Sequence, residues 1–300
     1  MVLKTALGPI LVTGGSGQLA SAVMHAKAGR SIRLAGRPEF DFDHPETIRP
    51  FLTATAPSLI INTAAHTAVD HAESEQAAAR RANTDGPRLL AEYAASANIP
   101  LIHISTDFVF DGTKGAPYVE TDATNPTSIY GRTKRDGENA ILATGARAII
   151  LRTSWVYAAT GRNFVLTMLS AAQKTNHLRV VADQHGCPTA AADLAAALLR
   201  IADRLTTTGW SDQYGGIFHA AGTGATSWHG FATEIFAEAA RHGVPTPTIT
   251  PIATADWPTP AARPADSRLD CARLGKTFGI ALPGWRLALA RTITMILSKN

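Results

Sequence analysis

Short apolar runs alternate with alanine- and leucine-rich segments of helical spacing through the first half of this 300-residue chain. The runs read as nearly continuous isoleucine, leucine and valine, which is typical of strands buried on both faces. Strands are expected at 9–13, 31–35, 58–62, 99–105 and 147–153, with helices over 72–97 and 130–143. This alternation predicts an α/β fold, a doubly wound parallel sheet covered by helices on both faces.

The regular alternation of strand and helix patterns ends at about residue 155, after which a helix is expected over 163–174 and a strand over 178–182. A helix over 190–205 and the apolar run 216–220 predict a return to the sheet, and the prolines of 245–264 predict an extended loop. The expected division is a sheet domain made of 1–155 with 190–222, and a smaller C-terminal lobe made of 156–189 with 223–300.

A hydrophobic content of 45% is enough for a sizeable core in a chain of this length. No apolar run approaches the roughly 20 residues of a membrane span. Residues 1–8 lead into the first expected strand without a cleavable signal pattern. We therefore expect a globular cytoplasmic protein that does not enter a membrane.

The net charge of +4 is small and spread along the chain without runs of lysine and arginine. Nucleic acid is therefore not an expected partner, although the balance suits an anionic small substrate. Cys187 and Cys271 are too few and too far apart in sequence for a disulfide framework or a metal cluster. We expect two ordinary thiols and no bound metal.

A glycine-rich turn, Thr-Gly-Gly-Ser-Gly-Gln-Leu at 13–19, follows the first expected strand. At Gly14 and Gly17 the missing side chains let the backbone approach a pyrophosphate, and the following helix supplies N–H groups and a positive dipole. Ala20 stands where a third glycine is usual, and alanine is accepted there. The position predicts a dinucleotide site on a Rossmann-type sheet, although glycine turns are also common as purely structural features.

The charge about 20 residues later bears on which dinucleotide binds. Where an acidic residue would hold the adenosine ribose hydroxyl, the chain runs Gly36-Arg37-Pro38, and arginine there favours a 2′-phosphate. NADPH is therefore the expected cofactor, with NADH left open by the nearby Glu39 and Asp41. An equal alternative is that Arg37 is only a solvated loop charge.

Tyr130 and Lys134 are four residues apart in an expected helix, which places both side chains on one face, about 5–6 Å apart at Cβ. A phenol with a pKa of about 10 exchanges protons efficiently near neutrality only beside a cation that stabilises the phenolate. Ser105 and Thr106 lie at the carboxyl end of the fourth expected strand, where ligands bind in such sheets. Either hydroxyl can hold a reacting carbonyl, or merely cap the next turn.

On these residues the chain resembles the extended short-chain dehydrogenase/reductase superfamily over nearly its whole length. The resemblance rests on the glycine turn and on segments at 64–73, 105–112, 130–134, 152–157, 186–189 and 263–270. It implies hydride transfer from a nicotinamide to C4 of a dTDP-bound 4-keto sugar. In that reaction Tyr130 gives the proton, Thr106 orients the carbonyl, and Lys134 tunes Tyr130 and binds ribose.

The same resemblance implies two sets of binding residues and a substrate-binding role for the smaller lobe. From the residues alone, a core role for Trp155, a loop role for His66 and a solvated charge at Arg263 remain open. Together with Gly14 and Arg37, which the residues themselves indicate, the expected cofactor residues are Gly17, Gln18, Leu19, Asp41, Phe42, Ala64, Ala65, His66, Tyr130 and Lys134, and the expected substrate residues are Thr106, Asp107, Tyr130, Trp155 and Arg263.

Some relatives in that superfamily hold magnesium between subunits through glutamates, one of them on the helix after the glycine turn. Here that helix opens Ala-Ser-Ala-Val at 20–23, so we expect a monomer or a homodimer that no metal bridges. Other sugar-nucleotide ketoreductases and epimerases share Tyr130 and Lys134, and dehydratases usually carry an acidic pair that Asp107-Phe108 lacks. A regulatory subunit that binds NADP without turnover has no need of a tuned proton donor.

Overall fold

The computed structural model describes residues 8–298, and its centre is a six-stranded sheet in which all neighbouring strands are parallel. After β1 the chain places β2 on one side and β3 on the other, so the winding reverses between β1 and β3. The doubly wound Rossmann-type fold expected from the alternation is confirmed, and this reversal point is where such sheets bind ligands. Across the sheet the strands are β10 (Gly216–His219), β5 (Ala148–Thr153), β4 (Leu101–Thr106), β3 (Leu59–Asn62), β1 (Ile10–Thr13) and β2 (Ile32–Ala35).

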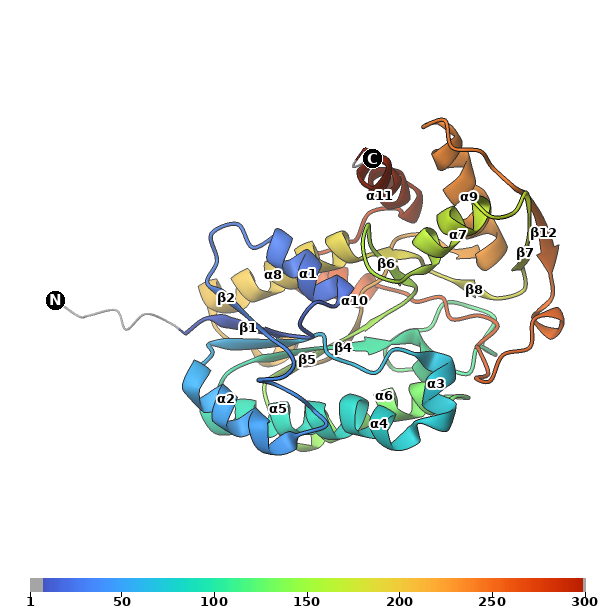
Figure 1. Cartoon of the computed structure of the whole chain (residues 1–300). Helices are drawn as coiled ribbons and strands as arrows, with labels where there is room; N and C mark the ends of the chain where they lie inside the picture. The colour runs from blue at the N-terminus through green and yellow to red at the C-terminus, as the bar shows by residue number, and fades with distance from the viewer. Residues whose placement is uncertain (1–7, 299–300) are drawn as a thin grey trace.

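Helices cover both faces of the sheet, as Figure 1 shows. The reason lies in the strands, whose successive side chains point to opposite faces. Val12 and Ile61 are buried against one helical layer, and Leu11 and Ile60 against the other. One layer holds α1 (Gln18–His25), α8 (Ala191–Thr208) and α10 (Ala272–Phe278), and the other holds α2 (Ile48–Thr55), α5 (Gly86–Ala97) and α6 (Ile129–Ala143).

Two expected helices differ from the structure. The spacing of apolar residues predicts that the helix after the glycine turn runs to about Gly29, but it ends at His25, because Ala28 and Gly29 adopt positive φ angles that an α-helix excludes. The continuous helix expected over 72–97 is broken into α3 (Val69–Ser74), α4 (Gln76–Arg80), a π-helical turn at Arg81–Asp85 and α5. Its alanine-rich composition carries no signal for these breaks.

The second half of the chain builds a smaller layer of helices beside the sheet (Figure 1). Tyr157, Phe231 and Trp285 share one hydrophobic core there. The prediction of an extended loop over 245–264 was wrong in part, because strand β12 forms within this segment and pairs in parallel with β7. The elements are β6 (Val156–Tyr157), α7 (Phe164–Ala172), β7 (His177–Val181), β8 (His185–Gly186), β9 (Thr189–Ala190), β11 (Thr226–Ser227), α9 (Trp228–Ala240), β12 (Thr248–Ile252) and α11 (Trp285–Leu297).

Pro251 lies inside β12, and the strand accepts it because the two-stranded sheet of β7 and β12 leaves one side of each strand unpaired. The strand expected at 216–220 is β10, which joins the main sheet beside β5. Where the two lobes divide stays a prediction. Within residues 8–298, none of the helices combines the length and apolar composition needed to cross a membrane.

Candidate active site

A cleft of about 1000 Å³ opens at the carboxyl ends of β1, β3 and β4. Parallel strands end at the same edge, so the segments that follow them meet there although they are distant in sequence. Every residue singled out for the site from sequence lines this cleft: Gly14, Gly17, Gln18, Leu19, Arg37, Asp41, Phe42, Ala64, Ala65, His66, Thr106, Asp107, Tyr130, Lys134, Trp155 and Arg263.

The glycine turn forms one wall of the cleft. Gly14 has a φ of +104°, and a Cβ there would lie 2.6 Å from the Thr63 hydroxyl oxygen. A Cβ on Gly36 would lie 2.8 Å from the Cα of Gly15. The turns after β1 and β2 therefore pack backbone against backbone, which leaves room for a pyrophosphate at the start of α1. Gly36 is a part of this cradle to which the sequence analysis assigned no packing role.

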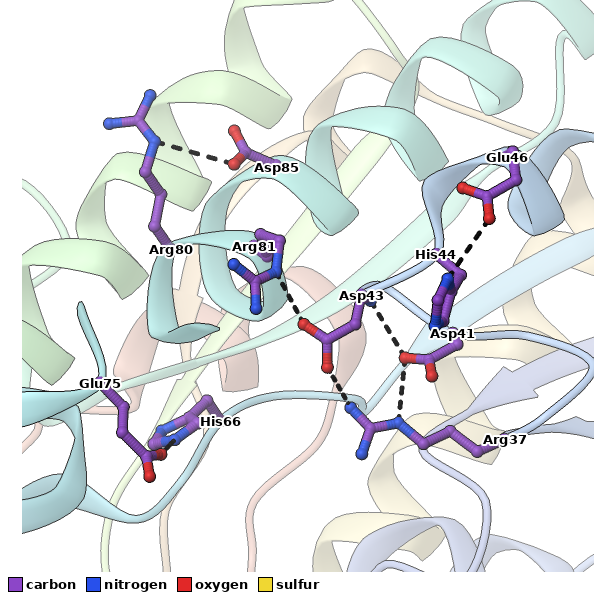
Figure 2. Close-up of polar contacts among 10 residues, drawn as sticks. All are labelled: Arg37, Asp41, Asp43, His44, Glu46, His66, Glu75, Arg80, Arg81 and Asp85. Atoms are coloured by element: carbon purple, nitrogen blue, oxygen red, sulfur yellow. Dashed lines mark hydrogen bonds and ion pairs between the residues drawn. The ribbon is translucent and has the colours of Figure 1, made fainter. Parts of the chain in front are cut away.

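Arg37 is neither free nor simply solvated. Its Nε donates to Oδ1 of Asp41 at 2.9 Å and its Nη2 to Oδ2 of Asp43 at 2.6 Å. Figure 2 shows that Arg81 approaches the same carboxylate of Asp43 from the helical side, with its Nε 2.7 Å from Oδ1. The Arg37 side chain stays 69% exposed. Asp43 and Arg81 carry no sequence signal that distinguishes them, and only their contacts in the folded protein place them beside Arg37.

The loop after β3 is pinned to the helical layer. Asn83 accepts a hydrogen bond from the His66 N–H at 2.8 Å and donates one to the His66 carbonyl at 3.1 Å. The His66 ring lies 3.2 Å from a Glu75 carboxylate oxygen (Figure 2). These contacts hold the backbone of Ala64 and Ala65 against the cleft.

Tyr130 and Lys134 both lie on α6, as expected, near its start. Ser128 caps this helix by accepting a hydrogen bond from the Gly131 N–H at 3.1 Å. Tyr130 is 9% exposed and lines the cleft. Burial raises the pKa of Tyr130 to about 12, an effect that the Thr106 hydroxyl opposes and the Asp107 charge reinforces.

Lys134 is buried, and its Nζ donates to the Ile104 carbonyl at 2.6 Å and lies 3.3 Å from Nε2 of His103. Burial lowers the pKa of Lys134 to about 8, and the charge of Glu138 opposes the shift. Burial therefore favours the uncharged amine of Lys134, which lies one helical turn from the phenol.

The sequence did not decide whether Ser105 or Thr106 could hold a reacting carbonyl, and in the structure the two hydroxyls have different hydrogen-bond partners. Ser105 donates to a buried Glu138 oxygen at 2.5 Å, which engages its hydroxyl within the core. Thr106 donates to Oδ1 of Asp107 at 3.0 Å and accepts from the Phe108 N–H at 3.2 Å. Thr106 thus caps the turn and also lines the cleft.

Asp107, Trp155 and Arg263 line the cleft, and the first two contact residues from the last third of the chain, Ser267 and Trp228 respectively. Burial raises the pKa of Asp107 to about 6, against hydrogen bonds from Ser267, Thr106 and Ser154 that lower it. Arg263 is paired with Asp70, its Nη2 2.9 Å from the carboxylate.

Trp155 stacks on Trp228 with ring centroids 3.4 Å apart, and both rings line the cleft. Trp155 has a positive φ of 48°, uncommon for a bulky residue. A Cβ on Gly186 would lie 2.5 Å from the Trp155 ring, so the ring lies directly over this glycine. Trp228 has no distinguishing sequence signal and was not among the residues expected at the site.

Across residues 8–298, histidine, cysteine, aspartate and glutamate side chains do not gather into a group able to hold a metal ion. Cys187 and Cys271 are free thiols.

Comparisons with known proteins show the family to which this chain belongs. Residues 8–298 match the family described as the RmlD substrate binding domain. A curated dTDP-4-dehydrorhamnose reductase of Sinorhizobium fredii is 44% identical over 289 residues, which cover 96% of this chain and 97% of the relative.

Solved structures give the same result. A dTDP-4-dehydrorhamnose reductase from Clostridium acetobutylicum superposes with a TM-score of 0.88 at 36% identity, over 96% of this chain and 99% of that one. The Bacillus anthracis dTDP-4-dehydrorhamnose reductase, solved in complex with NADP, superposes with a TM-score of 0.87 at 30% identity and the same coverage.

Proposed function

Because this chain belongs to the RmlD substrate-binding-domain family, whose relatives include dTDP-4-dehydrorhamnose reductases, we propose that it is an NADPH-dependent oxidoreductase that reduces the C4 ketone of dTDP-4-dehydro-L-rhamnose to dTDP-L-rhamnose. The observation that carries the proposal is the meeting of Tyr130, Lys134 and Thr106 in the cleft that the glycine turn also lines. We place the enzyme in the cytoplasm, as a monomer or a homodimer without a bridging metal.

The residues of the cleft fit a dinucleotide. The backbone of the glycine turn and the start of α1 would hold the pyrophosphate, because a side chain at Gly14 or Gly36 would fill the cradle. Arg37 and Arg81 would face a 2′-phosphate, while Asp41 and Asp43 suit the ribose hydroxyls of NADH. NADPH is the proposed cofactor, with NADH as an alternative. When bound, its nicotinamide supplies the hydride.

The chain's own side chains then handle the proton and the carbonyl. Thr106 would orient the C4 oxygen, and Tyr130 would give that oxygen its hydroxyl proton as negative charge develops. The ammonium of Lys134, one helical turn away, would stabilise the phenolate that forms as the proton leaves. Lys134 is held for this role by the Ile104 carbonyl, and Nζ retains a further N–H for the nicotinamide ribose.

The substrate would enter from the smaller lobe. Asp107 and Trp155 would contact the sugar nucleotide, and Arg263 would approach its diphosphate while keeping its ion pair with Asp70. In this arrangement the segments 1–155 and 190–222 bind NADPH, and the segments 156–189 and 223–300 bind the dTDP-sugar.

A turnover assay tests the proposal. We would mix the purified chain with dTDP-4-dehydro-L-rhamnose and NADPH, follow the absorbance of the reduced cofactor, and assign the C4 configuration of the product by NMR. Oxidation of NADPH with formation of dTDP-L-rhamnose is the expected result. Cofactor binding without oxidation would instead identify a non-catalytic NADP-binding subunit. Interconversion of C4 epimers without net oxidation would identify an epimerase.

A further inference from the structure

A line of buried polar side chains crosses the sheet and ends at Lys134. Thr13, Asn62 and His103 are register partners on β1, β3 and β4, and their exposed fractions are 0%, 1% and 0%. Buried strands normally place apolar side chains at such positions, and polar groups persist there only when they are hydrogen-bonded. These three satisfy one another across the sheet.

The contacts along this line are continuous. The Thr13 hydroxyl donates to Asn62 Oδ1 at 2.5 Å, and Asn62 Nδ2 lies 2.8 Å from His103 Nδ1. The other ring nitrogen of His103, Nε2, lies 3.3 Å from Lys134 Nζ. The line therefore joins the first strand of the fold to the lysine of the proposed active site.

The direction of these hydrogen bonds follows from their donors. Asn62 Oδ1 also receives the Ala64 N–H at 3.2 Å, so two donors meet that oxygen and the Asn62 NH₂ group must face His103. His103 Nδ1 then accepts. Burial and the nearby charge of Lys134 lower the pKa of His103 well below its ordinary value, so the ring is neutral. Its single proton therefore lies on Nε2 and points at Lys134.

The Nε2–H of His103 interacts differently with the charged ammonium and the uncharged amine of Lys134. An ammonium has three donors and no lone pair, so it cannot accept the Nε2–H of His103. An uncharged amine can accept it, and in either state Nζ still donates to the Ile104 carbonyl. The line of side chains thus favours the uncharged amine, in the same direction as burial.

One charge near Lys134 opposes this effect. On α6, Tyr130 and Glu138 lie one turn before and one turn after it, and Glu138 raises the pKa of Lys134. The carboxylate of Glu138 is engaged by Arg152 on β5 and by Ser105 on β4. The carboxyl group of Asp107, just beyond β4, acts on Tyr130.

We propose that Asn62 and His103 are positioning residues of the reductase: they present an imidazole N–H to Lys134 and so set the pH at which Lys134 loses the charge that Tyr130 needs. The inference rests on the proposed function for its link to turnover. The hydrogen-bond line itself is testable in the unliganded protein.

The first experiment reads the tautomer of His103 by long-range ¹H–¹⁵N NMR on the full chain labelled at histidine. We expect the proton on Nε2 in the wild type. In Asn62→Asp the new carboxylate has the size of the amide but only accepts, so the ring proton should move to Nδ1. A wild-type ring protonated at Nδ1 would overturn the proposal without any need for turnover or for the variant to fold.

The second experiment measures the pH midpoint of Lys134 from the His103 Nε2 shift, and the alkaline limb of kcat against pH. In Asn62→Asp, Nε2 accepts from the ammonium and the new carboxylate adds a negative charge nearby, so both should move upward by about one pH unit, a tenfold change in proton concentration. Tyr93→Phe is the control, because it removes a hydrogen bond to the Leu52 carbonyl on α2 and should move neither.

These readouts separate the two proposals. If the wild type does not turn over the sugar nucleotide, the reductase assignment fails, and the proposed link to the reaction fails with it. The NMR midpoint would still decide whether Asn62 and His103 control the protonation of Lys134. A shifted midpoint with an unmoved alkaline limb would show that the line acts on Lys134 but not on the reaction. An unshifted midpoint in Asn62→Asp would overturn the inference.

Discussion

The carboxylate of Glu138 on α6 holds the guanidinium of Arg152 on β5 in a buried ion pair, with Oε2 2.6 Å from Nη2. The Arg152 and Glu138 side chains are 3% and 2% exposed, respectively. Oε1 of Glu138 also accepts the Ser105 hydroxyl and the Arg152 Nε–H. The pair therefore fastens the helix that carries Tyr130 and Lys134 to the strands beside it.

We expect Glu138→Gln to lower the free energy of unfolding by about 3–5 kcal/mol, because it leaves the Arg152 charge buried without a counter-charge. Urea unfolding followed by circular dichroism measures the change. Glu92→Gln is the matched control, since Glu92 forms an exposed pair with Arg88 that contributes at most about 1 kcal/mol. Equal losses in the two variants would contradict a structural role for the buried pair.

Tyr130→Phe should lower kcat by about 10²- to 10⁴-fold, because it removes the proposed proton donor and keeps the ring. The ring packs edge-on against Phe108 with centroids 5.6 Å apart, a contact that phenylalanine preserves. The dissociation constant of NADPH, measured by fluorescence titration, should stay within about twofold if the hydroxyl acts in the chemical step. A variant that kept wild-type turnover would remove Tyr130 from the mechanism.

The charge network around Arg37 should set the preference between NADPH and NADH. Asp43→Asn removes a carboxylate that both Arg37 and Arg81 contact, so we expect NADPH to bind about tenfold more tightly relative to NADH, or about 1.4 kcal/mol. Arg37→Ala should shift the preference the other way. Titration of each variant with both cofactors checks this, and unchanged ratios in both variants would place the 2′-phosphate elsewhere.

Asp107 should make the protein less stable as the pH rises. Its pKa is raised by burial to about 6 from an ordinary 3.8, so between these values the folded state binds more protons than the unfolded state. That contribution is present below about pH 4 and is lost as the pH passes about 6; two pKa units correspond to at most about 3 kcal/mol.

Asp107→Asn removes this titration and keeps an acceptor for the Thr106 hydroxyl. Its free energy of unfolding, relative to that of the wild type, should therefore be higher at pH 7.5 than at pH 4.5. Urea unfolding of both proteins at the two pH values measures this. The same difference at both values would show that Asp107 titrates normally in the folded protein.

The fold was accessible from sequence because its signals are local. Each buried strand is a short apolar run, and the turn after β1 needs glycine at Gly14 whatever lies around it. The pairing of Tyr130 with Lys134 also follows from spacing alone, since four residues make one helical turn. Strand ends and helical spacing therefore indicated the glycine turn, Thr106, Tyr130 and Lys134, whereas most of the other residues that line the cleft were implied by the resemblance to a known superfamily.

The breaks in the expected helix over 72–97 and the strand β12 inside the proline-rich segment were not predicted, because both depend on neighbours from distant parts of the chain. The same holds for what each site residue contacts. Only the tertiary structure decided that Asp43 and Arg81 join Arg37, and that His103 meets Lys134. Sequence spacing determines the direction of a side chain along its own helix or strand, whereas its hydrogen-bond partners depend on how separate helices and strands pack together.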